Sequence, residues 1–153
     1  MKQKKYFGKS LQEVEQLAVL ELGVSKDDLY FDVISPVGTK DEEMEIEVMV
    51  DANPVKKGKD FLETFLKEAN IDGFVERKMR DNVVEFSVDA GEFNGVLIGK
   101  NSRHLIALQI LMSSIINKYY EDGEQMIVKV DVGGYRQRRE SHLERMAVEF
   151  GKQ

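Results

Sequence analysis

Hydrophobic residues recur at helical spacing near the start of the chain. The stripe consists of Leu11, Val14, Ala18 and Leu22 and predicts one amphipathic helix. Ser10-Leu-Gln-Glu13 has the Ser-x-x-Glu form of a capping box, which places the beginning of this helix at Ser10. Gly23 follows the last apolar position and is predicted to end the helix.

The pattern then changes from helical spacing to that of strands. Residues 29–34 are rich in β-forming residues and run into Ser35-Pro36-Val37-Gly38, a turn signal. Met44, Ile46, Val48 and Val50 alternate with Glu45, Glu47 and Met49, the pattern of a half-buried strand. With a short strand at Tyr6-Phe7, these elements predict a β-α-β-β module over residues 1–55.

A polar break separates this module from the next. Asn53-Pro54 and Lys56-Lys57-Gly58-Lys59 mark the boundary, and Asp60 is placed to cap the helix that follows. Strands are predicted at residues 74–79 and 83–88, then a short apolar turn, a loop, a helix over residues 105–120 and a strand at residues 126–132. The fold class is therefore α+β, and residues 56–132 have the order α-β-β-α-α-β.

The loop between the apolar turn and the long helix carries the chemistry of the chain. Val96-Leu-Ile98 leads into Gly99-Lys100-Asn101-Ser102, and the helix follows. A helix, a tight loop with a basic tip and a second helix are how a KH domain clamps a nucleic-acid backbone, with bases in an apolar groove alongside. Together with the element order, this predicts a type II KH fold that binds single-stranded RNA. The predicted binding residues are Ile98, Gly99, Lys100, Asn101, Ser102 and Arg103.

Each loop residue also has a plainer interpretation. Gly99 lets a phosphate approach closely, but a glycine there is also an ordinary helix C-cap. Lys100 and Asn101 supply a cation and a hydrogen-bonding amide for RNA; in the plainer interpretation they only form a solvated turn. Ser102 suits the N-cap of the next helix. His104 is interpreted as a surface helix residue, and Arg103 as a residue that reaches a phosphate.

The C-terminal residues, 133–153, predict one further helix that begins at Tyr135. Arg138, Arg139 and Arg145 are predicted as additional phosphate contacts. Glutamates interleave with them, so intrahelical ion pairs are an equal alternative. Tyr135 either stacks on a base or packs against the core.

Composition narrows the function further. The net charge is −6, and residues 1–55 account for all of it with 6 Lys/Arg against 12 Asp/Glu, which makes the N-terminal module a poor RNA-binding surface. Cysteine is absent, and no apolar run reaches the roughly 20 residues of a membrane helix. The N-terminus has no signal-peptide pattern, so we expect a cytoplasmic protein. No spacing suits a metal or a catalytic group, and we expect a protein that is not an enzyme and needs no cofactor.

Three motifs in order resemble the Jag (SpoIIIJ-associated) family of bacterial RNA-binding proteins. They are Gly95-Val-Leu-Ile-Gly99-Lys100, Leu105-Ile-Ala-Leu-Gln109 and Asp131-Val-Gly-Gly-Tyr135-Arg-Gln-Arg138-Arg139-Glu140. The N-terminal Gly8-Lys9-Ser10 and Leu22-Gly23-Val24 are similar to that family's first domain. The resemblance implies a Jag module, a KH domain and the start of an Arg-xxx-His domain. It also implies RNA regulation linked to cell elongation, division or sporulation, with a second, smaller KH protein as partner.

The chain departs from that family at two points. The fourth position of the family's Gly-x-x-Gly loop is Ser102, which predicts a loop of the same shape with less freedom. The Arg-xxx-His motif itself does not occur in residues 133–153. A second hypothesis therefore stays open, in which the acidic N-terminal module docks a protein partner and the KH unit forms a homodimer.

Overall fold

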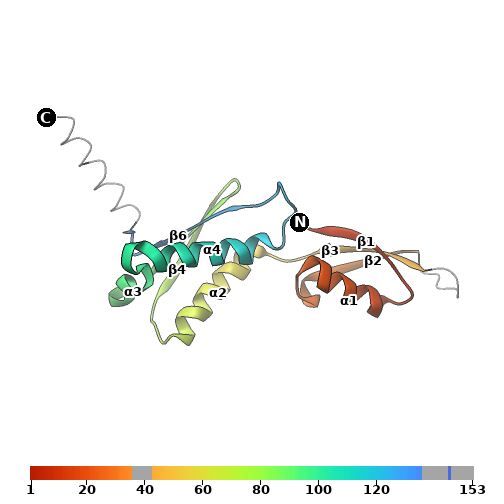
Figure 1. Cartoon of the computed structure of the whole chain (residues 1–153), viewed down its shortest axis with the longest axis horizontal. Coiled ribbons are helices and arrows are strands. Elements are labelled where there is room, and N and C mark those ends of the chain that lie inside the picture. The colour runs from red at the N-terminus through yellow and green to blue at the C-terminus, as the bar shows by residue number, and fades with distance from the viewer. Residues whose placement is uncertain (36–42, 136–144, 146–153) are drawn as a thin grey trace. The chain divides into compact units, whose positions relative to one another are not determined.

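A computed structural model describes residues 1–35, 43–135 and 145 of the chain. These residues form two compact units. The first unit consists of Met1–Pro54 together with Ile115–Gln125, and the second of Val55–Ser114 and the residues from Met126 onward. The described residues form helices and two small three-stranded sheets, so the predicted α+β class is confirmed (Figure 1).

The first unit is an antiparallel sheet with one helix. Its elements are β1 (Gln3–Gly8), α1 (Leu11–Leu22), β2 (Leu29–Ser35) and β3 (Met44–Val50). The central strand of this sheet is β3, which lies between β1 and β2. The predicted helix ends are confirmed: the Glu13 amide donates to Ser10 Oγ at 3.2 Å, and Gly23 ends α1 at φ 69°.

The core of the first unit combines residues far apart in the sequence. The apolar stripe of α1, apart from the exposed Leu11, packs with Tyr6 of β1 and alternate residues of β3, and Tyr119 joins them at 3% exposure. The Tyr119 hydroxyl donates to Asp28 Oδ2 at 3.2 Å, and the Lys2 amide donates to the Tyr119 carbonyl at 3.0 Å. The residues after α4 therefore complete the core of the N-terminal sheet.

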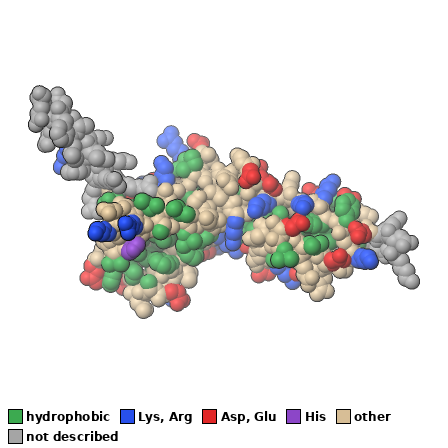
Figure 2. All heavy atoms as spheres, in the orientation of Figure 1, with side chains coloured by type: hydrophobic (Ala, Val, Ile, Leu, Met, Phe, Trp, Pro, Cys, Tyr) green, Lys and Arg blue, Asp and Glu red, His purple; other side chains and the backbone are tan. Residues whose placement is uncertain are grey.

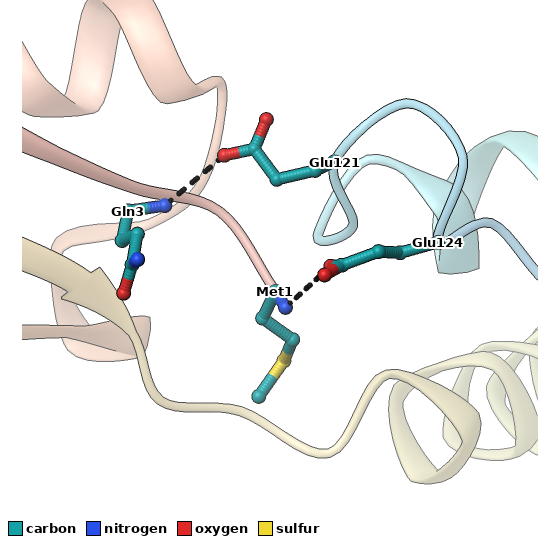
Figure 3. Close-up of polar contacts among 4 residues, drawn as sticks. All are labelled: Met1, Gln3, Glu121 and Glu124. Carbon is teal, nitrogen blue, oxygen red and sulfur yellow. Dashed lines mark hydrogen bonds and ion pairs between the residues drawn. The ribbon is translucent and has the colours of Figure 1, made fainter.

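Two further contacts, from Met1 and Gln3, tie the beginning of the chain to the same segment (Figure 3). The Gln3 amide donates to Glu121 Oε1 at 3.2 Å, and the ammonium group of Met1 forms an ion pair with Glu124 at 2.9 Å. The ion pair is largely exposed and contributes little by itself. The placement of the segment therefore depends mainly on the buried Tyr119.

The remaining elements lie wholly or mostly in the second unit. They are α2 (Pro54–Glu68), β4 (Phe74–Arg80), β5 (Val83–Asp89), α3 (Asn94–Ile98), α4 (Arg103–Asn117) and β6 (Ile127–Val132). The central strand β5 pairs antiparallel with β4 and parallel with β6. This arrangement is compatible with a KH-like fold.

One face of this second sheet is buried. Val84, Phe86 and Val88 of β5 are at most 2% exposed, whereas the residues between them are partly exposed. Leu62, Leu66, Leu97, Leu105 and Met112 are buried residues of the helices. Since successive side chains of a strand point to opposite faces, the core lies on one side of the sheet.

The predicted start of α2 is wrong. The helix begins at Pro54, ahead of the Lys56-Lys57-Gly58-Lys59 run that predicts a polar break, and not at Asp60. Proline suits the first helical position because an N–H at that position would have no partner within the helix, so its absence costs no hydrogen bond. Gly58 is buried within α2, so the glycine does not mark a break in the chain. The predicted C-terminal helix lies outside the described residues, apart from Tyr135 and Arg145.

Candidate nucleic-acid interface

The candidate interface begins where α3 ends at Gly99. The Gly99 amide donates to the Gly95 carbonyl at 2.9 Å, which closes the last turn of α3. Gly99 itself adopts φ 73° and ψ 173°, a combination that is essentially restricted to glycine. The chain thus changes direction here at a residue that no other amino acid can replace without strain.

The next three residues form a single tight turn before α4. The Ser102 amide donates to the Gly99 carbonyl at 3.3 Å. Asn101 and Ser102 both adopt left-handed backbone conformations, with φ 57° and 61°. Asparagine tolerates this region better than most residues, but each such residue still costs about 1 kcal/mol or more. The loop must therefore be held in place by contacts on either side.

His104 supplies one of these contacts. Its Nδ1 lies 2.7 Å from the Val96 carbonyl oxygen, and since a carbonyl only accepts, Nδ1 is the donor. The ring also lies against Gly99, where an added Cβ would be only 2.7 Å from His104 Cγ. Sequence reasoning assigned His104 to a plain helix surface and missed this role. The only signal was its position just after the loop.

Ser102 supplies the second contact. Its side chain points inward at 5% exposure, and its Oγ donates to the Tyr135 hydroxyl at 2.8 Å. This hydroxyl pair joins residues 33 positions apart. Ser102 is thus a buried, hydrogen-bonded residue, and its side chain does not cap α4.

Lys100 and Asn101 face the solvent, as does Arg103 in the first turn of α4. No Asp or Glu occurs from residue 93 to residue 120, so the local charge is positive although the whole chain carries −6. Figure 2 shows Lys and Arg side chains beside the histidine at this end of the second unit, with hydrophobic side chains alongside. A localised positive tip of this kind attracts anions without a basic surface overall.

The apolar residues of the turn divide between core and surface. Leu97 and Leu105 are buried, as expected for core residues. Ile98 is half-buried, and Val96 is 62% exposed. Val96 and Ile98 therefore offer apolar surface next to the cationic loop.

The start of α3 is fixed by a small polar network. Asp89 Oδ1 accepts hydrogen bonds from the Gly91 amide at 3.1 Å and from Asn94 Nδ2 at 3.2 Å. The Gly91 amide, and then Asn94, hold the pKa of the Asp89 carboxyl below its usual value. Asn94 Oδ1 in turn accepts the Ala90 amide at 2.7 Å. These bonds position α3, and thereby the loop that follows it.

The predicted C-terminal contacts are only partly within the structure. Arg145 is exposed, whereas Arg138 and Arg139 lie outside the described residues. Within residues 1–35, 43–135 and 145, no group of three His, Asp or Glu side chains is placed to hold a metal ion. Over the same residues, no helix has the length and hydrophobicity needed to cross a membrane.

Comparison with known proteins gives two similar relatives. No family model matches the chain. The chain is 28% identical over 145 residues to the RNA-binding protein KhpB of Clostridium symbiosum, and the match covers 91% of the chain and 64% of that protein. It is 27% identical over 152 residues to the RNA-binding protein KhpB of Bacillus subtilis (strain 168), with coverages of 95% and 72%. The chain thus spans about two thirds of the length of the first relative.

Gly95 lies within α3 and Gly99 ends this helix, and the two glycines should respond in opposite ways to replacement by alanine. Gly99→Ala forces a Cβ into the His104 ring and a side chain into a glycine-only conformation. It should destabilise the second unit by about 1–3 kcal/mol. In Gly95→Ala the added Cβ has no atom within 4 Å, and residue 95 is helical, so this change should stabilise the second unit by about 0.4–1 kcal/mol.

Hydrogen exchange of the β5 and β6 amides measures the stability of this unit separately from the first. Equal protection of these amides in the two variants would contradict the described geometry of the loop.

Proposed function

We propose that this chain binds single-stranded RNA through the loop Gly99–Arg103. The observation that carries the proposal is the orientation of the loop: Lys100, Asn101 and Arg103 are exposed, while Ser102 is turned inward. Two similar proteins are named as RNA-binding, which agrees with this proposal. A KH-like unit with a cationic tip between two helices is suited to clamp a short stretch of nucleic-acid backbone.

The chemistry of binding follows from the side chains at the tip. Lys100 and Arg103 pair with phosphates, and the positive end of α4 adds to their potential. Asn101 provides both a donor and an acceptor for phosphate or sugar oxygens. The apolar surface of Val96 and Ile98 takes the adjoining bases, and sequence preference comes from this part of the interface.

Two cations at the tip imply moderate, salt-dependent affinity. With about two phosphates neutralised, the logarithm of the binding constant should fall with the logarithm of the salt concentration with a slope of about −1.4. The acidic first unit, with its net charge of −6 over residues 1–55, opposes unspecific binding elsewhere on the chain. Arg138, Arg139 and Arg145 are proposed as auxiliary contacts that would steepen this slope.

The cellular role of the protein is part of the same proposal. We infer a non-enzymatic, cytoplasmic RNA regulator that needs no cofactor, with a link to cell elongation, division or sporulation. That link rests on the family resemblance alone. A second, smaller KH protein as partner belongs to the same resemblance.

Charge reversal at the tip tests the proposal. Lys100→Asp combined with Asn101→Asp should weaken binding of labelled single-stranded RNA by about tenfold to a hundredfold, because two contacts become repulsive. The salt slope should shrink by about 0.7. Fluorescence anisotropy at two salt concentrations measures both quantities.

Lys67→Asp combined with Asn70→Asp is a matched control. Both residues are exposed at the end of α2, and Asn70 has φ 56°, nearly that of Asn101 at 57°. The control should bind RNA almost as well as the unchanged chain. An equal loss of RNA affinity in the two double variants would attribute the effect to the overall charge and would contradict the assignment of the binding site to the loop.

A second candidate function, protein association, is favoured by the outer face of α4. Ile106, Ala107, Ile110 and Leu111 are exposed, and α4 carries no charged residue after Arg103. Exposed apolar patches of this kind mark interaction sites. A second copy of the chain would present the same uncharged face, so neither copy would have to bury a charge.

Ile110→Glu tests this association. A charge at a residue that is 64% exposed should leave the fold intact and abolish any dimer seen by sedimentation velocity. Met79→Glu, at a residue 53% exposed on β4, is the control and should leave the dimer unchanged. A chain that is monomeric before either change rules out this homodimer.

The acidic first unit offers another surface for the same class of function. Leu17 and Leu20 are exposed on α1, at 40% and 80%, with exposed Glu13 and Glu21 on the same helix. An apolar patch with carboxylates around it suits a basic protein partner better than RNA. Docking by the N-terminal module therefore stays a prediction beside the RNA-binding proposal.

A further inference from the structure

The loop is tied to a residue that lies well beyond the second sheet in the sequence. Ser102 Oγ donates to the Tyr135 hydroxyl at 2.8 Å. Tyr135 follows Gly133-Gly134, where the chain leaves β6, and its ring is half-buried. The bond thus joins the fourth residue of the loop to the first residue of the C-terminal segment.

The position of Tyr135 is itself well defined. The Gly133 amide donates to the Val88 carbonyl at 2.8 Å, so the chain is still attached to β5 where it leaves β6. A Cβ on Gly133 would lie only 2.7 Å from Asn94 Nδ2, which shows that this turn packs closely against the start of α3. The turn after β6 therefore contacts Asn94, the first residue of α3. Tyr135, just beyond this turn, contacts the loop that follows the last residue of α3.

Ser102 needs an external contact in a way that a glycine would not. Its φ of 61° lies in the left-handed region, where a side chain on Cβ is crowded against the backbone. Burial of its hydroxyl at 5% exposure would be unfavourable without a hydrogen-bond partner. The Tyr135 hydroxyl provides that partner, and it also fixes the direction of the Ser102 side chain.

We propose that Tyr135 is a positioning residue of the nucleic-acid loop. By accepting the hydrogen bond from the Ser102 hydroxyl, Tyr135 holds the loop in the conformation that turns Lys100 and Asn101 outward. The effect on RNA affinity rests on the function proposed above, while the effect on the loop does not. A further consequence is that a movement of Tyr135, at the start of the C-terminal segment, changes the affinity of the loop for RNA.

A double-mutant cycle isolates the hydroxyl bond. Tyr135→Phe removes only the hydroxyl and should weaken binding of a labelled mixed-sequence single-stranded RNA roughly threefold to tenfold. In the Ser102→Gly chain the same Tyr135→Phe change should leave the affinity unaltered, because glycine adopts the conformation unaided and has no hydroxyl to satisfy. Equal losses in both backgrounds, or a loss only on Tyr135→Leu, would assign the effect to the aromatic ring and overturn the proposal.

A measurement without RNA separates this inference from the proposed function. The heteronuclear NOE of the Asn101, Ser102 and Arg103 amides in the free chain should fall on Tyr135→Phe, with the β5 amides unchanged as a control for folding. If the NOE falls and the unchanged chain binds no RNA, the positioning role stands and the proposed function fails. If RNA binds and the NOE is unaffected, the positioning role is wrong and the proposed function stands.

Discussion

The turn at Gly99 is the constraint on which the candidate interface depends. Its φ of 73° and ψ of 173° end α3 and let the chain enter α4 after only three residues. A side chain at this position would collide with His104, whose ring fills the space beside the glycine and whose Nδ1 donates to the Val96 carbonyl. The abrupt turn is what places a cation and an amide at the tip and a serine on the inside.

The strain of this turn is offset by contacts from both sides. Asn101 and Ser102 are in left-handed conformations, which are unfavourable for residues with a Cβ. His104 secures the loop from α4, and Tyr135 secures it from the end of β6. A loop preorganised in this way loses less conformational entropy when it binds a ligand, which favours affinity from a small number of contacts.

The regular elements could be predicted from the sequence because burial leaves a periodic pattern. Residues 44–50 alternate between apolar and polar up to Val48 and form β3 over the same bounds. The capping box at Ser10 and the stop at Gly23 follow from local hydrogen bonding. The start of α2 was misplaced, because lysines and a glycine at its beginning resemble a linker although Pro54 opens a helix.

The long-range contacts could not be predicted by the same means. Tyr119 follows a long apolar helix, and nothing nearby in the sequence indicates that it forms a hydrogen bond with Asp28. The Ser102–Tyr135 bond likewise joins two residues whose local patterns suggest an N-cap and a base-stacking or core aromatic. Periodicity and capping report which residues are buried or begin a helix, and not which distant residue they meet.

The most direct test of the central claim is an NMR titration of the ¹⁵N-labelled chain with short single-stranded RNA. The account predicts that the largest amide shift changes fall on Gly99 to Arg103, with smaller ones at Val96 and Ile98, and that they fade as salt is raised. Shift changes centred on the first unit, with the loop amides unmoved, would contradict it.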